Sequence, residues 1–162
     1  MVYPMILRGP VQFSPLVAKV TALLLLGVLV GCSDPGRRNQ AAEDSPLKPI
    51  ARFYAEYVTQ HQGKPPQGEA EFKAYLKEPK NAERLQKEHQ ITDIDKLLIS
   101  PRDSKPFIIY YGAMSKNSGP GGAPVVGYEQ QGLGGKRLVV STLGAVVEVD
   151  DGEFRKLVPD AK

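Results

Sequence analysis

The sequence predicts an α+β fold, in which N-terminal helices pack on a small antiparallel sheet of about four strands. Two observations favour it. Between residues 46 and 99 apolar residues recur at helical spacing, whereas after residue 105 short β-branched and aromatic runs alternate with glycine-rich turns. Helices that precede strands are typical of an α+β domain, and short turns between consecutive strands favour an antiparallel meander over a parallel sheet.

The first helix is expected to begin near residue 45. Ser45 is expected as its N-cap and Pro46 in its first turn. Its apolar stripe follows i, i+3, i+4 and i+7 spacing and consists of Leu47, Ile50, Ala51, Tyr54, Tyr57, Val58 and His61. Gly63 and the two prolines after it end the helix. We expect this stripe to lie across the sheet.

Two further helices and an apolar cluster complete the first half. A second helix is expected over residues 69–77, with Pro79 stopping it, and a weakly amphipathic third over residues 81–89. A compact apolar group then precedes Ser100 and consists of Ile91, Ile94, Leu97, Leu98 and Ile99.

Four strands are expected in the second half, over residues 106–111, 125–129, 138–142 and 145–149. The glycine-rich segments 119–122 and 132–135 lack the G-x-G-x-x-G spacing and a following helix. Hairpin turns are therefore expected there instead of a phosphate-binding loop. Asp150 and Asp151 are expected to cap a short C-terminal helix.

Residues 1–31 have the composition of an export signal. Arg8 and Lys19 make the leading segment basic, and residues 20–30 form an apolar stretch of about eleven residues that is followed by the small residue Gly31. This stretch is shorter than the roughly 20 residues of a membrane-spanning helix. The alternative is a short buried helix, which rarely follows a basic leader at an N-terminus.

Cys32, the one cysteine of the chain, ends the apolar stretch in the run Leu29-Val30-Gly31-Cys32. This run resembles the lipobox of bacterial lipoprotein precursors, in which the cysteine receives a diacylglycerol thioether and becomes the first residue after cleavage. The resemblance implies a palmitate-type lipid anchor at Cys32, after a signal peptide of residues 1–31. Several acyl chains together hold a protein durably at a membrane. Residues 32–45 are expected to form a flexible tether, and residues 46–162 a single globular domain.

Charge and cysteine use exclude several kinds of chemistry in the mature chain. The formal net charge of the whole chain is +3, and removing Arg8 and Lys19 with the signal leaves +1. A nearly neutral chain gives no electrostatic reason to bind nucleic acid. Since lipidation consumes the single thiol, neither an intrachain disulfide nor a Cys/His zinc site is expected.

No catalytic, cofactor-binding or metal-binding constellation is expected. His61 and His89 lie at no ligand spacing from each other or from paired carboxylates, and no serine lies in a G-x-S-x-G context. Asp93 and Asp95 are better explained by a capping turn than by a calcium loop, because the glycine and glutamate of such a loop do not follow at the required offsets.

The polar pair of most interest is Arg102-Asp103, in the segment Ser100-Pro101-Arg102-Asp103 between the apolar cluster and the first expected strand. An aspartate in such a place closes a turn on backbone amides. We therefore interpret the two residues as an internal turn-closing pair. The alternative is a binding site to which Arg102 supplies the charge.

Three motifs carry a resemblance to known proteins, and they are Ser100-Pro101-Arg102-Asp103-Ser104-Lys105-Pro106-Phe107, Pro124-Val125-Val126-Gly127-Tyr128-Glu129 and Gly135-Lys136-Arg137-Leu138-Val139. Over about residues 47–158 they resemble a group of small, mostly uncharacterised lipoproteins of planctomycete-type bacteria. Members show Ser-Pro-Arg-Asp-Gly before a strand, and some show Asp-Gly-His where this chain has Leu143-Gly144-Ala145. The helix-on-sheet arrangement also resembles the globular part of type II secretion pseudopilins, although true pilins have a prepilin cleavage site and a long uninterrupted assembly helix.

These observations predict a lipid-anchored protein of the bacterial cell envelope that faces the periplasm. Ser33 rather than an aspartate follows the cysteine, which favours the outer membrane. A non-enzymatic binding or scaffolding role is expected, with the membrane and an unidentified envelope protein as partners. The alternative is a pseudopilin-like component of a secretion or assembly system. A small envelope enzyme, which needs a concave pocket with convergent polar groups, is the third possibility.

Overall fold

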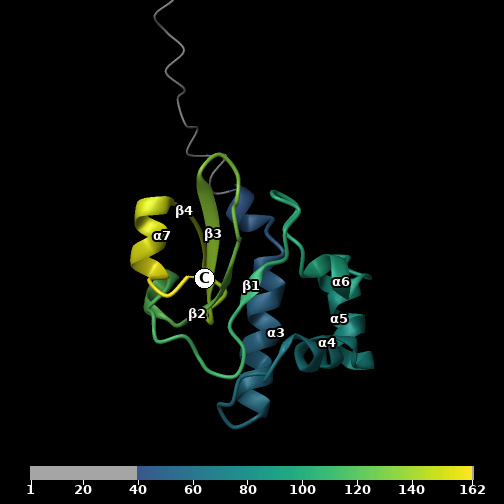
Figure 1. Ribbon diagram of the computed structural model, residues 1–162. Coiled ribbons are helices and arrows are strands. Elements are labelled where there is room, and N and C mark those ends of the chain that lie inside the picture. Colours follow the sequence, from purple (N-terminus) through teal and green to yellow (C-terminus); the bar gives the residue numbers. More distant parts are fainter. Residues whose placement is uncertain (1–39, 162) are drawn as a thin grey trace, which may run out of the picture. The chain divides into compact units, whose positions relative to one another are not determined.

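The structure, a computed structural model, describes residues 40–161. The expected signal peptide, Cys32 and the first part of the expected tether lie outside the described residues. A four-stranded antiparallel sheet accompanied by helices confirms the expected α+β fold. In chain order the elements are α3 (Leu47–Gln60), α4 (Glu69–Lys77), α5 (Pro79–His89), α6 (Ile94–Leu97), β1 (Ile108–Ile109), η1 (Pro120–Gly122), β2 (Val125–Tyr128), β3 (Lys136–Ser141), β4 (Val146–Asp150) and α7 (Asp151–Leu157), as Figure 1 shows.

The folded domain starts earlier than the sequence indicated. Residues 40–43 form a short helical turn, in which the amide of Asp44 donates to the carbonyl of Gln40 (2.9 Å). Ala42 is 8% exposed and belongs to the main apolar core, and Ser45 is buried as well. The expectation of a tether up to Ser45 is therefore wrong for residues 40–45, because a small apolar side chain in this polar stretch packs into the core.

α3 is the central helix, and its ends follow the expected signals. The Ser45 hydroxyl accepts a hydrogen bond from the Leu47 amide (3.2 Å), and Pro46 between them already has helical angles, so Ser45 caps the first turn and Pro46 lies in it, as expected. At the other end Gly63, with φ +85°, donates its amide to the carbonyl of Val58 (2.8 Å) and closes the last turn. The buried members of the expected stripe are Leu47, Ile50, Ala51, Tyr54 and Tyr57.

α4 has the expected bounds, whereas Pro79 has a different role from the one expected. The proline occupies the first turn of α5, where its missing N–H costs nothing because the first amides of a helix have no partner within it. Two residues further on, the buried Asn81 donates to the carbonyl of Tyr75 in α4 (2.8 Å) and joins the two helices. α6 begins after Asp93, whose carboxylate accepts from two amides of the first turn (3.0 and 3.1 Å), which confirms the expected capping turn.

The sheet is an antiparallel meander with strand order β1-β2-β3-β4, as expected. β1 is only two residues long, shorter than the expected range 106–111. Pro106, which has no amide to donate, forms a separate bridge with Ile99 outside the sheet. β3 lies between β2 and β4, and Val139 is paired on both sides.

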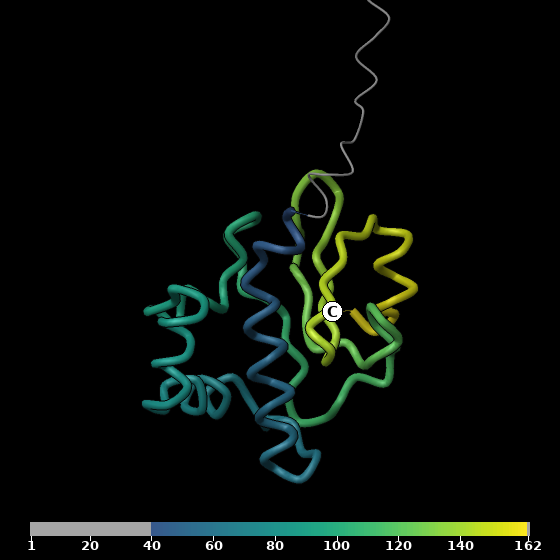
Figure 2. Tube along the Cα trace, turned by 180° about the vertical axis from the view of Figure 1, so that it is seen from behind, coloured from purple at the N-terminus to yellow at the C-terminus, as the bar shows by residue number. Residues whose placement is uncertain are grey.

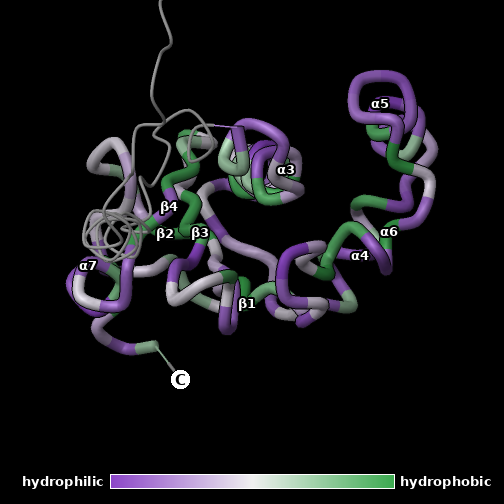
Figure 3. Tube along the Cα trace, turned by 90° about the horizontal axis from the view of Figure 1, so that it is seen from above, coloured by the Kyte–Doolittle hydropathy of each residue, from purple (hydrophilic) through white to green (hydrophobic). Residues whose placement is uncertain are grey.

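The sheet separates two apolar clusters. α3 covers one face, as expected, and α7 covers the other (Figures 2 and 3). Figure 3 also shows α4, α5 and α6 beyond α3, away from the sheet. Along β3 the side chains alternate between the two clusters, since Leu138 and Val140 belong to the α3 side and Val139 packs with Phe154 of α7. Asp150 caps α7 by accepting from the amide of Glu153 (2.9 Å), which confirms the expected C-terminal helix.

Candidate functional site

The polar residues of the segment 100–105 lie in a closed loop between α6 and β1. The Ser100 amide donates to the carbonyl of Lys105 (2.8 Å), and the Ser104 amide donates to the carbonyl of Ser100 (2.9 Å). Ser100 is fully buried, and its hydroxyl accepts from the amide of Arg102 (3.1 Å). The loop therefore folds back on itself and holds the polar pair of interest at fixed positions.

Arg102 lies between two glutamates from the sheet. Its Nη2 is 2.6 Å from Oε1 of Glu148 on β4, and its Nη1 is 3.4 Å from Oε2 of Glu129, which follows β2. The arginine side chain is 13% exposed, that of Glu148 is 11% exposed, and that of Glu129 is fully buried. Because all three groups are withdrawn from water, their pairing neutralises charges that would otherwise be costly to bury. We call Ser100, Arg102, Glu129 and Glu148 the Arg102 cluster.

Glu129 extends the ladder between β2 and β3 with its side chain. Its amide donates to the carbonyl of Leu138 (3.0 Å), and its Oε2 accepts from the Leu138 amide (2.9 Å), a bond that a backbone carbonyl makes in a regular ladder. Its Oε1 accepts from the Ser100 hydroxyl (2.7 Å). Burial raises the pKa of Glu129, and the hydrogen bonds from Ser100 and Leu138 and the charge of Arg102 only partly oppose that rise.

Asp103 binds a different segment, the loop between β2 and β3. Its Oδ1 accepts from the Lys105 amide (3.0 Å), and its Oδ2 accepts from the amides of Gln131 (3.0 Å) and Gly132 (2.8 Å). Burial raises the pKa of Asp103, but hydrogen bonds from these three amides outweigh burial and leave the pKa below its ordinary value. Gly132 has φ +69°, and a Cβ there would lie 1.9 Å from the carbonyl oxygen of Lys136, so only glycine fits.

Arg102 and Asp103 thus hold one loop to two parts of the sheet, each with its own partners. This geometry favours an internal turn-closing pair over a binding-site arginine, because the guanidinium faces two carboxylates and little of it reaches solvent. Glu129 and Glu148 were not among the residues expected from the sequence. Their signals are weak, since Glu129 merely follows a strand and Glu148 interrupts the valines of β4.

No protein-family model, curated protein or solved structure matches this chain. The likeness to pseudopilins and to planctomycete-type lipoproteins is therefore not confirmed. Within residues 40–161 no helix is long and apolar enough to cross a membrane. In the same part of the chain, no group of three or more His, Cys, Asp or Glu side chains is placed to hold a metal ion.

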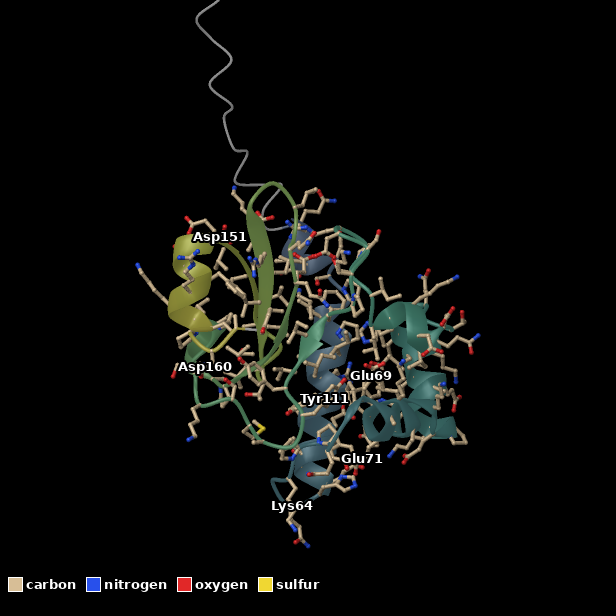
Figure 4. All side chains as sticks on the ribbon, viewed as in Figure 1. Lys64, Glu69, Glu71, Tyr111, Asp151 and Asp160 are labelled. Atoms are coloured by element: carbon tan, nitrogen blue, oxygen red, sulfur yellow. The ribbon has the colours of Figure 1, made fainter. Side chains whose placement is uncertain are left out.

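A second polar cluster lies near the C-terminal end of α3. The Tyr57 hydroxyl donates to Oε1 of Glu71 (2.5 Å), and Oε2 of Glu71 accepts from the Gln67 amide (2.5 Å). The His61 ring stacks on Tyr57 with ring centroids 3.8 Å apart. The hydrogen bond to Glu71 raises the pKa of Tyr57 to about 12 and lowers the pKa of Glu71. Figure 4 shows Glu71 and Lys64 at this end of the domain, where the cluster ties α4 to α3.

A shallow groove of about 700 Å³ runs along α3 to the turn between β3 and β4. Glu56 lines it from the helix, Leu143 from the turn, and His89 from the end of α5. Arg84 of α5 holds Glu56 through two nitrogens (2.6 and 2.8 Å), and this hydrogen bonding lowers the pKa of Glu56. The carboxylate in the groove is therefore already paired with the protein's own arginine.

Proposed function

We propose that the protein is a lipid-anchored protein of the bacterial cell envelope, held by Cys32 and facing the periplasm. Its α+β domain is a non-enzymatic binding or scaffolding module, with the membrane and an unidentified envelope protein as partners. The observation that carries the proposal is the run Leu29-Val30-Gly31-Cys32, which ends an apolar stretch behind a basic leader. Ser33 after the cysteine favours the outer membrane.

The short link between the cysteine and the domain supports this arrangement. Seven residues separate Cys32 from Gln40, the first described residue, and Ala42 already packs into the core. Fully extended, that link spans at most about 30 Å. An anchor at Cys32 would therefore keep the domain close to the membrane surface.

The Arg102 cluster supports a scaffolding role over catalysis. Its guanidinium and carboxylates pair with one another and fix a loop to the sheet. A catalytic acid or base must instead reach a proton of a bound substrate. The buried charges of the Arg102 cluster therefore hold the loop of residues 100–105 in a fixed position on the sheet, and a fixed surface of this kind is what a binding module requires.

Replacing Cys32 by alanine tests the anchor. We expect Cys32→Ala to abolish metabolic labelling with palmitate and to leave the unprocessed precursor, since the chain has no other thiol. Ser33→Ala changes the neighbouring polar residue and is the matched control, which should keep the label. Unchanged labelling of the Cys32→Ala chain would contradict both the anchor and the envelope location.

The packing of α3 on an antiparallel meander supports a second candidate function. This is a pseudopilin-like component of a secretion or assembly system, in which a lipid anchor replaces the pilin helix. Co-purification of the full chain with secretion machinery after mild crosslinking would support it. Recovery of the anchored chain without such machinery would favour the scaffolding module.

A further inference from the structure

The loop between β2 and β3 ends in a tight turn with an apolar side chain at its tip. The Leu133 amide donates to the carbonyl of Lys136 (2.9 Å), and the Lys136 amide donates to the carbonyl of Leu133 (3.1 Å). Gly134 and Gly135 between them have φ +61° and +74°, the positive angles of a type I′ hairpin turn. Leu133 is 61% exposed, and the two glycines beside it have no side chains to cover it. We call residues 132–136 the hairpin tip.

The hairpin tip is held in place by the loop of residues 100–105. Asp103 accepts from the amides of Gln131 and Gly132, immediately before Leu133. The Arg102 cluster fixes that loop in turn to β2 and β4. An apolar side chain on a held tip loses less conformational freedom on binding than one on a loose loop. The Ser-Pro-Arg-Asp segment therefore gives the tip a fixed direction.

The hairpin tip lies at the end of the domain where the described chain begins. Figures 1 and 2, drawn from opposite sides, both show the β2–β3 hairpin and the start of α3 at the same end. Figure 4 shows Lys64 at the opposite end. Since at most about 30 Å of extended chain joins Cys32 to Gln40, a lipid on Cys32 would bring the end with the hairpin tip to the membrane.

We propose that the hairpin tip rests on a phospholipid surface, with Leu133 entering the boundary between headgroups and acyl chains. The inference rests on the lipid anchor proposed above. Tethering supplies a high local concentration, so the burial of a single apolar side chain favours one orientation of the anchored domain. Lys136 at the tip and Lys105 in the loop that holds it are outside ion-pair distance of every carboxylate in residues 40–161. Their ammonium groups are therefore available to lipid phosphates.

A cysteine at the tip tests this contact in the full lipidated chain. Acylation consumes the thiol of Cys32, so Leu133→Cys introduces one free thiol, which is labelled with the fluorophore NBD before the protein is placed in vesicles of phosphatidylethanolamine and phosphatidylglycerol. Leu143→Cys is the matched control, because Leu143 is 72% exposed and follows the other end of β3. A strand of that length spans about 20 Å. Both leucines are exposed, so neither change disturbs the core.

We expect nitroxide-bearing lipids to quench the label at position 133 several-fold more than at position 143, and aqueous iodide to do the reverse. Equal quenching at both positions, in protein whose Cys32 is acylated, would overturn the inference and leave the anchor intact. A Cys32 peptide that itself takes up the label would overturn both. The vesicles contain no other protein, and quenching by nitroxide-bearing lipids separates shielding by lipid from shielding by a second copy of the chain.

Discussion

Replacing Arg102 by methionine removes the cation between two carboxylates and keeps most of the side-chain volume. At an effective dielectric constant of about 20, unit charges 3.4 Å apart, as for Arg102 and Glu129, attract each other by roughly 5 kcal/mol. Desolvation offsets part of this, and removing one partner of a buried ion pair costs about 3–5 kcal/mol. Because Glu129 keeps hydrogen bonds from Ser100 and Leu138, we expect Arg102→Met to lower the free energy of unfolding at neutral pH by about 3 kcal/mol.

The size of this loss should depend on pH in a direction set by Glu129. Burial raises the pKa of Glu129 in the folded state above the ordinary value of about 4.3, which applies to the unfolded chain. The stabilisation from its protonated form is therefore complete below that ordinary pKa, and it is lost as pH rises through the pKa of the folded state. Without Arg102 the buried carboxylate is less favourable still. The cost of Arg102→Met should therefore be smaller at about pH 4 than at about pH 7.

Urea unfolding of a fragment from Asp34 to Lys162, followed by circular dichroism, measures both effects. Arg155→Met is the matched control, because Arg155 is exposed on α7 and makes no ion pair within residues 40–161; it should change the free energy of unfolding by less than about 0.5 kcal/mol. The double variant Arg102→Met/Glu129→Gln should regain part of the loss, since it also removes the unpaired charge. A loss below about 1 kcal/mol, or one that is the same at both pH values, would refute the role given to the buried pair.

Two further changes test the loop of residues 100–105. Ser104 has φ +56°, a left-handed conformation that costs a non-glycine residue about 1 kcal/mol. Glycine removes this cost, but its greater conformational freedom in the unfolded chain offsets part of the gain. Ser104→Gly should therefore raise the free energy of unfolding by about 0.5 kcal/mol. Ser104→Ala should bring no gain, and thermal unfolding of the two variants decides. Burial raises the pKa of Asp103, but hydrogen bonds from three amides outweigh burial and hold this pKa below its ordinary value. The ionised carboxylate therefore contributes its full stabilisation above the ordinary pKa of about 3.9, and this contribution is lost as pH falls toward the pKa in the folded state. In urea unfolding at a series of pH values, Asp103→Asn should make the free energy of unfolding depend less on pH across that acid range. An unchanged dependence on pH would show that the carboxylate does not hold the hairpin.

Local signals were sufficient to predict most of the helices, and the errors also have local causes. α4 has its expected bounds because its apolar spacing is regular and its ends are marked. Pro79 was misread because a proline can end one helix and occupy the first turn of the next. Ala42 was missed because one alanine among polar residues gives no periodicity, yet its side chain packs into the core.

The Arg102 cluster could not be assembled from the sequence, because its members are distant along the chain. Ser100 and Glu129 are 29 residues apart, and Arg102 and Glu148 are 46 residues apart. Strand register brings the two glutamates together, since Glu148 pairs with Leu138 and Glu129 binds the backbone of the same residue. The sequence indicated that Arg102 and Asp103 close a turn, but the groups they bind follow only from that register.

Mass spectrometry of the N-terminal peptide of the mature protein, purified from bacterial membranes, tests the lipid anchor most directly. We predict that the first residue is Cys32, that its sulfur carries a diacylglyceryl group, and that residues 1–31 are absent. A mature protein that still carries residues before Cys32, or whose Cys32 thiol is unmodified, would contradict the anchor on which the proposed function rests.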